Sequence, residues 1–174
     1  MKILVIDDNP LHREAAKAQL AEHDLTIVDN YDEARKLILN GGFRISESQH
    51  SFDVVLTDLL MPVTEKTHGN YEQGLTGQEM PLGIFLALLA IGGGAKYVGL
   101  ITDANHHKNP LAACLDDFEP YKVLDFIPET KVIFKNYGST KKFNPKNLAE
   151  ETDDWDNYVW AKDWVELLNY LLET

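Results

Sequence analysis

Short apolar runs alternate with longer amphipathic segments along most of the chain. Each run is five or six residues long, rich in Val, Ile and Leu, and bounded by polar or turn-forming residues. Such runs are typical of strands buried in a parallel sheet. The pattern predicts five strands, over residues 2–6, 24–29, 52–57, 97–102 and 131–135.

Segments with apolar residues at helical spacing follow these runs. Two of them begin with an asparagine and a proline, Asn9-Pro10 and Asn109-Pro110. Asparagine is a good N-cap, and proline suits the first helical position. We expect five helices, over residues 10–22, 31–40, 80–94, 111–118 and 155–173.

Strands that alternate with helices predict a doubly wound α/β fold, in which helices cover both faces of a five-stranded parallel sheet. Two polar segments, near residues 63–80 and 136–153, lack apolar periodicity and are interpreted as long inserted loops. We find no linker that would divide the chain, so residues 1–174 are expected to form one domain.

Charge and cysteine content narrow the function classes. The formal net charge of −12 argues against a surface that binds nucleic acid or an anionic membrane. Cys114 is the only cysteine, which excludes an internal disulfide and favours a reducing compartment. The N-terminus is too acidic for a signal peptide, and no apolar stretch is long enough to span a bilayer. We therefore expect a cytoplasmic protein.

Polar residues follow four of the five expected strands. In a doubly wound fold, the carboxyl ends of the strands carry the functional groups. Here they carry three acids, one hydroxyl and one lysine, which are Asp7, Asp8, Asp58, Thr102 and Lys135. Each alone has a structural explanation, such as a helix cap, a solvated acid or a snorkelling lysine. Together, at one edge of the sheet, they favour a functional site.

Three clustered carboxylates repel one another unless a cation joins them, and Mg²⁺ prefers carboxylate oxygens and water as ligands. A carboxylate beside such a metal can attack a phosphoryl group and form an aspartyl phosphate. The transferred group carries charge on three oxygens, which a lysine and a hydroxyl stabilise. The set therefore predicts phosphoryl chemistry.

The chain resembles the receiver domain of bacterial two-component response regulators over about 120 residues, in four stretches: ILVIDDN (3–9), DVVLTDLLMP (53–62), VGLITD (98–103) and VIFK (132–135). The resemblance implies a flavodoxin-like fold with strand order 2-1-3-4-5. It makes Asp58 the phosphoacceptor, and implies that Thr102 and Lys135 bind the phosphoryl group. The implied Mg²⁺ ligands are Asp7 (mostly through water), Asp8, Asp58 and the main-chain carbonyl of Leu60.

The function expected from this resemblance is that of a single-domain response regulator. A histidine kinase or a phosphotransfer protein would phosphorylate Asp58 in a Mg²⁺-dependent reaction, and the output would be contact with another protein, since no DNA-binding domain is expected. Such a protein is a switch and catalyses only its own phosphorylation and dephosphorylation. The sequence neither favours nor excludes a homodimer.

Four features depart from the receiver pattern. Val132 stands where an aromatic switch residue is usual, Asp103 where a small residue follows the threonine, and Asn136 where proline follows the lysine. An insertion over 63–82 precedes Gly83, the expected equivalent of a loop glycine. These departures motivate the alternative of a pseudo-receiver, a binding module that does not use phosphorylation.

A third reading is a phosphohydrolase that forms an aspartyl phosphate. Such enzymes have a second acid two residues after the nucleophile, and here that residue is Leu60. The sequence therefore gives this reading little support.

Several further residues invite a functional reading. His68, Tyr71 and Glu72, in the 63–80 loop, could cover Asp58 or contact a partner. His106 and His107 could bind a metal, but adjacent histidines on a turn seldom point together. A set of aromatic residues is expected to pack the last helix onto the sheet, with an exposed interface as the alternative: Trp155, Tyr158 and Trp160.

Overall fold

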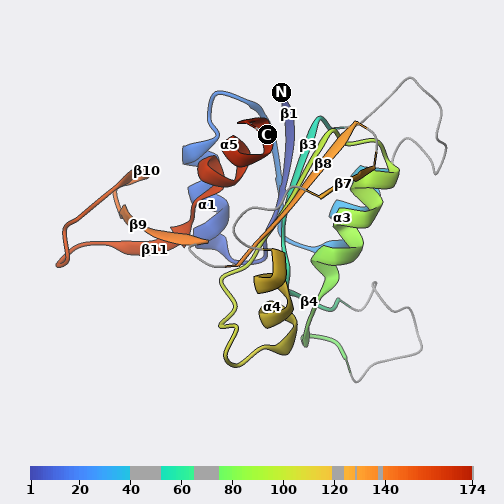
Figure 1. The fold of residues 1–174 in the computed structure, drawn as a ribbon. Helices are drawn as coiled ribbons and strands as arrows, with labels where there is room; N and C mark the ends of the chain where they lie inside the picture. The colour runs from blue at the N-terminus through green and yellow to red at the C-terminus, as the bar shows by residue number, and fades with distance from the viewer. Residues whose placement is uncertain (40–51, 65–74, 119–123, 128, 137–138, 174) are drawn as a thin grey trace.

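A computed structural model of the chain describes residues 1–39, 52–64, 75–118, 124–127, 129–136 and 139–173. A six-stranded sheet forms its centre, in the order β2-β1-β3-β6-β8-β7 (Figure 1). Its strands are β1 (Lys2–Ile6), β2 (Asp24–Val28), β3 (Val54–Asp58), β6 (Tyr97–Ile101), β7 (Leu124–Ile127) and β8 (Thr130–Lys135). Five strands are parallel and β7 is antiparallel at one edge, so the predicted parallel sheet is confirmed.

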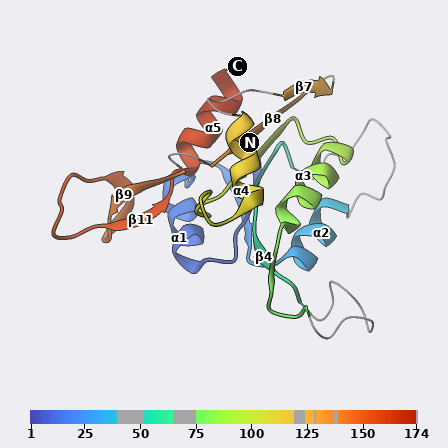
Figure 2. The same ribbon diagram turned by 60° about the horizontal axis from the view of Figure 1, so that its bottom comes forward.

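Helices cover both faces of this sheet, as the alternation predicts (Figures 1 and 2). Their bounds are α1 (Pro10–Gln19), α2 (Tyr31–Leu39), α3 (Leu82–Gly92), α4 (Pro110–Leu115) and α5 (Trp164–Glu173). Both expected N-caps form. Asn9 Oδ1 accepts from Leu11 N at 3.0 Å, and Asn109 Oδ1 accepts from Leu111 N at 3.0 Å.

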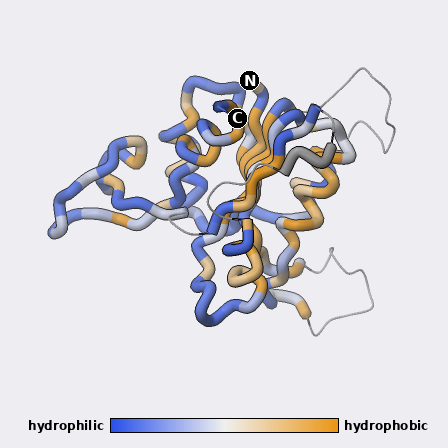
Figure 3. The backbone as a smooth tube through the Cα atoms, viewed as in Figure 1, coloured by the Kyte–Doolittle hydropathy of each residue, from blue (hydrophilic) through white to orange (hydrophobic). Residues whose placement is uncertain are grey.

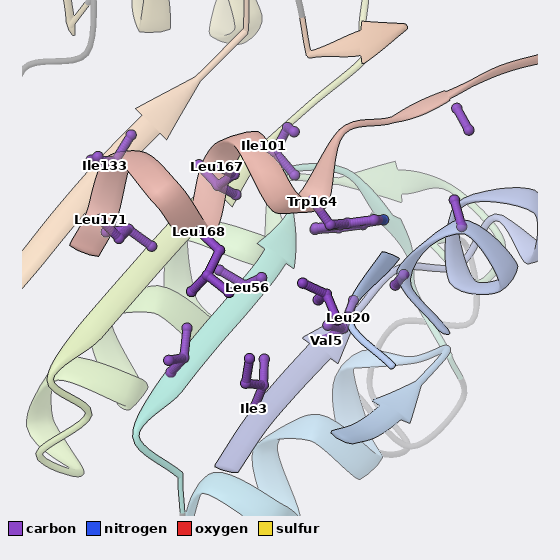
Figure 4. Close-up of a cluster of buried hydrophobic side chains, with 14 of the residues drawn as sticks. Ile3, Val5, Leu20, Leu56, Ile101, Ile133, Trp164, Leu167, Leu168 and Leu171 are labelled. Atoms are coloured by element: carbon purple, nitrogen blue, oxygen red, sulfur yellow. The ribbon is translucent and has the colours of Figure 1, made fainter. Parts of the chain in front are cut away.

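The two faces of the sheet divide the core. Ile3 and Val5 of β1 pack against α1 and α5, whereas Leu4 and Ile6 pack against α2 and α3. This is the alternation that a strand imposes on its side chains. In Figure 4, α5 lies over β3 and β6, with Trp164, Leu167, Leu168 and Leu171 directed into the core.

Residues 139–163 differ from the prediction. A second, three-stranded antiparallel sheet, here called the side sheet, has the order β10-β9-β11. Its strands are β9 (Thr140–Asn144), β10 (Asn147–Glu151) and β11 (Val159–Lys162). The loop predicted over 136–153 is therefore wrong where β9 and β10 form, and the last helix begins at Trp164 rather than at 155. The side sheet projects away from the main sheet beside α1 (Figures 1 and 2).

Local hydrogen bonds explain this difference. Lys146 N donates to Asn144 Oδ1 at 3.0 Å, which forms a side-chain turn between β9 and β10. Asp163 Oδ1 accepts from Glu166 N at 2.9 Å and caps α5. The helix therefore starts after Asp163, and the residues before it are free to form β11.

Trp160 lies in β11, and Trp155 and Tyr158 lie in the segment between β10 and β11. The expectation that these residues pack the last helix onto the sheet is therefore wrong. Trp155 is 73% exposed and Trp160 is 51% exposed. Each meets Tyr158 edge to face, with ring centroids 6.3 Å and 5.8 Å apart. Figure 3 shows the side sheet as largely hydrophilic, in contrast to the apolar strands of the main sheet.

The predicted loop near 63–80 is closed at its ends by a short ladder between β4 (Met61–Pro62) and β5 (Glu79–Met80). Residues 65–74, which include His68, Tyr71 and Glu72, lie outside the described residues. Within the described part of the chain, none of the helices has both the length and the apolar character needed to cross a bilayer.

Candidate functional site

The expected site residues lie at one end of the sheet, because four parallel strands end there. Asp58 ends β3 and is paired in register with Ile101 of β6, which is paired with Lys135 of β8. Asp7 follows β1, and Thr102 follows β6. This edge lies at the end of the sheet opposite the N-terminus, where α4 and β4 are found (Figure 1).

Three carboxylates form an acidic cluster at this edge. One oxygen each of Asp7, Asp8 and Asp58 lies within 4.8 Å of the others. Asp7 is fully buried, Asp58 is 6% exposed and Asp8 is half-buried. The prediction that these three acids converge is confirmed.

A lysine that the sequence did not single out lies inside this cluster. Lys162 Nζ is 2.7 Å from Asp7 Oδ2 and 2.9 Å from Asp58 Oδ1. It is also 3.9 Å from Asp103 Oδ1. The lysine is fully buried, and two buried acids compensate the cost of moving its charge out of water.

Helix α1 holds β11, and with it Lys162, over the cluster. The side chain of Gln19 donates to the carbonyls of Leu148 and Lys162, both at 3.1 Å. Its carbonyl accepts from Trp164 N at 2.8 Å. Trp164 Nε1 donates to His12 O at 2.9 Å. These bonds hold the end of β11 and the start of α5 against α1.

His12 connects β11 to the acid that follows Thr102. Its Nδ1 accepts from Lys162 N at 3.4 Å, and its Nε2 is 3.1 Å from Asp103 Oδ2. Because Nδ1 accepts, we assign the proton to Nε2, which donates to Asp103. Asp103, which stands where the receiver pattern has a small residue, is thus hydrogen-bonded to His12 beside the acidic cluster.

Burial and neighbouring charges shift the pKa values of the charged side chains at the site, some upward and one downward. Burial is the largest effect on Asp58 and raises its pKa to about 7, although Lys162 opposes this change. Burial and repulsion from Asp7 raise the pKa of Asp8. The hydrogen bond from His12 lowers the pKa of Asp103 to about 2. The acids around Lys162 outweigh its burial and raise its pKa.

Lys135 lies away from the acidic cluster, and its expected binding of the phosphoryl group stays a prediction. Its ammonium forms an ion pair with Glu166 of α5 and lies 5.6 Å from the ring of Tyr170. Strand β6 lies between β8 and β3. The backbone of Lys135 is therefore two strands, or about 9–10 Å, from that of Asp58. Among the described residues, Lys162 is the lysine whose ammonium contacts Asp58.

Thr102 keeps its expected place at the edge. It is buried, its amide donates to Lys135 O at 3.0 Å, and its Oγ1 accepts from Ala104 N at 3.1 Å. Its hydroxyl is therefore held in the turn that follows β6.

The backbone around Asp58 is held from two sides. Leu59 N donates to Asp58 Oδ1 at 2.7 Å, and Gly83 N donates to Leu59 O at 3.0 Å. A Cβ atom at Gly83 would lie 1.8 Å from Asp58 O, so only glycine fits. The side chain of Leu60 packs beside Leu59 in a small apolar cluster, and its carbonyl as a metal ligand stays a prediction.

The donor set fits a hard divalent cation. Asp7, Asp8 and Asp58 offer carboxylate oxygens at close range, and one ammonium does not neutralise three carboxylates. Mg²⁺ takes ligands of this kind. Chemically, the arrangement offers a carboxylate nucleophile, a buried cation and a hydroxyl at the end of a parallel sheet.

No family model, curated protein or solved structure matches this chain.

Proposed function

We propose that the chain is a receiver-type phosphoacceptor, a single-domain response regulator that accepts a phosphoryl group on Asp58. The observation that carries this proposal is the position of Asp58 at the end of β3, with Asp7 and Asp8 within 4.8 Å and Lys162 Nζ at 2.9 Å. Acceptor, metal-binding acids and cation are the groups that phosphoryl transfer to a carboxylate requires.

The strand order supports a flavodoxin-like form of this fold. Numbered in chain order, the five parallel strands β2-β1-β3-β6-β8 follow the sequence 2-1-3-4-5. Such sheets bind their ligands beyond the carboxyl ends of the strands, at the point where the strand order reverses. The acidic cluster lies at that point, between β1 and β3.

In the proposed reaction, the second carboxylate oxygen of Asp58 attacks the phosphorus of a phosphohistidine on a kinase or a phosphotransfer protein. The P–O bond forms as the P–N bond breaks, and the electron pair returns to the donor imidazole. Asp58 Oδ1, held by Leu59 N and Lys162, orients the carboxylate. Asp7 and Asp8, with Asp58, would hold Mg²⁺, which would offset the charge of the phosphoryl oxygens.

Lys162 takes the role of the phosphoryl-binding lysine in this proposal. The opposite charges around it keep it protonated, and its ammonium already touches the acceptor. Thr102, at the end of the neighbouring strand, would donate its hydroxyl to a phosphoryl oxygen. A change at Asp58 would reach the side sheet through Lys162, and we place the contact with an output protein there, where Trp155 and Trp160 are exposed.

The proposal is tested by incubating the full chain with a small phosphodonor and Mg²⁺ and measuring the intact mass. Wild type is expected to gain one phosphoryl group, and Asp58→Asn to gain none. Asp24→Asn, an exposed acid at the start of β2, is the matched control and should label like wild type. Equal labelling of Asp58→Asn and wild type would exclude Asp58 as the acceptor.

A second candidate function is a pseudo-receiver that does not use phosphorylation. The observation that favours it is the same ammonium, because Lys162 already lies between Asp7 and Asp58 where a cation would bind. A titration with Mg²⁺ and beryllofluoride, followed through the amide spectrum, separates the two functions. A spectrum that does not change would support the pseudo-receiver.

A further inference from the structure

The turn between β6 and α4 brings two adjacent histidines together. His106 Nε2 and His107 Nε2 are 3.1 Å apart, and the ring centroids are 4.1 Å apart. Adjacent histidines on a turn seldom point together, so this close approach differs from what the sequence predicts. His106 is half-buried and His107 is exposed, so the pair is accessible from solvent.

A carboxylate sets the tautomer of His106. Its Nδ1 lies 2.7 Å from Asp116 Oδ2, so this nitrogen carries the proton that faces the acid. The lone pair of His106 is then on Nε2, which accepts a hydrogen bond from His107 Nε2 at 3.1 Å. A metal ion bound by both rings would replace the proton of this bond. This carboxylate–histidine arrangement is what orients a metal-binding imidazole and makes it more basic.

Asp116 is itself held in place. The buried side chain of Asn136 donates to Asp116 Oδ1 at 2.9 Å and to Ala112 O at 3.0 Å. On the other side of the pair, His107 N donates to Asn105 Oδ1 at 2.9 Å, which fixes the turn. The two rings are therefore positioned by Asn105 in the turn and by Asp116, which follows α4. Asp116 is held in turn by Asn136, which follows β8.

The separation of the two nitrogens suits a shared metal ion. Two imidazole nitrogens, each about 2.0–2.1 Å from a tetrahedral Zn²⁺, lie about 3.3 Å apart. Two imidazoles select borderline metals such as Zn²⁺, Cu²⁺ or Ni²⁺ over Mg²⁺, which prefers oxygen. An open pocket lined by Asp103, Asn105 and Thr140 adjoins the pair and leaves room for water as the remaining ligands.

We propose that His106 and His107 form a binding site for a divalent transition metal ion, with Asp116 as the residue that positions His106. The site is separate from the acidic cluster of Asp7, Asp8 and Asp58, and it does not depend on the proposed phosphoryl transfer.

The test is a titration of the full chain with Zn²⁺ in excess Mg²⁺, followed by ¹⁵N NMR of the histidine side chains. We expect the Nε2 resonances of His106 and His107 to shift, while those of His12 and His23 stay. His107→Gln should weaken Zn²⁺ binding at least tenfold, and Asp116→Asn about tenfold to a hundredfold. His23→Gln, a histidine outside the site, should bind like wild type.

The variants also show where the ion binds. Since His107 is exposed, His107→Gln is expected to keep the fold, and its amide spectrum checks this. The proposal is overturned if the Nε2 resonances of His106 and His107 do not move, or if folded His107→Gln binds Zn²⁺ as tightly as wild type. Loss of Zn²⁺ binding in Asp58→Asn would also overturn it, because the ion would then bind the acidic cluster.

Discussion

The ammonium of Lys162 lies 2.9 Å from Asp58 Oδ1, although 104 positions separate the two residues in the sequence (162 − 58). The same nitrogen is 2.7 Å from Asp7 Oδ2. This contact joins the side sheet to the end of the main sheet. The side sheet therefore supplies the cation of the acidic cluster formed by Asp7, Asp8 and Asp58.

Removing the charge of Lys162 should destabilise the protein strongly in the absence of metal. Lys162→Met leaves Asp7 and Asp58 buried without their cation, and breaking a buried pair in this way costs about 3–5 kcal/mol. Mg²⁺ should stabilise this variant more than it stabilises wild type, because it supplies the missing positive charge. Urea unfolding with EDTA and with Mg²⁺ measures both effects.

The control for this change is Lys146→Met, at the exposed turn between β9 and β10, which should unfold like wild type. If Lys162→Met and Lys146→Met unfold at the same urea concentration, the buried ammonium does not stabilise the cluster.

The two buried lysines should differ in their effect on phosphoryl binding. We expect Lys162→Met to weaken binding of beryllofluoride with Mg²⁺ at least tenfold, since its Nζ contacts the acceptor. Lys135→Met should bind within a few-fold of wild type, because the ammonium of Lys135 pairs with Glu166. Titrations followed through the amide spectrum measure both affinities for the folded fraction.

The opposite ranking of these two variants would return the phosphoryl-binding role to Lys135 and leave Asp58 as the acceptor. Loss of binding in both variants, with both folded, would mean that the site needs both lysines.

The pH dependence of stability should contain a contribution from Asp58. Its pKa is raised from 3.8 to about 7 in the folded protein, so the folded state holds this proton more tightly than the unfolded chain. The stabilisation that Asp58 adds to the free energy of unfolding is therefore complete below about pH 4, and it is lost as the pH rises through about 7. Asp58→Asn removes this loss, so its stability relative to wild type should increase from about pH 5 to about pH 8 in EDTA.

Asp103 provides the opposite case. Its pKa is lowered to about 2, so its contribution is present above about pH 4 and is lost only as the pH falls through about 2. Between about pH 5 and about pH 8, the free energy of unfolding of Asp103→Asn should thus change with pH as it does in wild type. If the free energies of unfolding of Asp58→Asn and wild type change equally with pH, Asp58 is ionised in the folded protein throughout this range.

Much of the site could be predicted from local pattern alone. Apolar runs ending in Asp7, Asp58 and Thr102 mark strands of a parallel sheet, and neighbouring parallel strands end at the same edge. The convergence of the three acids follows from this geometry without any knowledge of long-range contacts.

Lys162 could not be found in this way, because its place depends on contacts between β11 and α1, far apart in the sequence. One long helix is predicted from a stripe of residues at helical spacing, which are Tyr158, Ala161, Trp164, Leu168 and Leu171. Two local signals pointed the other way. Asn144-Pro145 is a turn signal, and Asp163 with Glu166 three residues later has the form of a capping box.

The pairing of His106 with His107 depends on tertiary contacts as well. The end of β8 supplies Asn136, which orients Asp116, which in turn orients His106. No spacing rule for adjacent histidines contains this information.

Gly83 should tolerate no side chain. In Gly83→Ala, the new Cβ would lie 1.8 Å from the carbonyl oxygen of Asp58 and 2.8 Å from its carbon, and both are backbone atoms that cannot rotate away. We expect a loss of stability of at least about 1–3 kcal/mol, typical of overpacking, together with weaker labelling of Asp58 as β3 and α3 move apart. Gly92→Ala is the matched control near the end of the same helix, because its Cβ would meet nothing within 4 Å. It should be neutral or more stable by up to about 1 kcal/mol. Urea unfolding and phosphodonor labelling of both variants measure these effects, and equal stability of the two would contradict the close approach of α3 to Asp58.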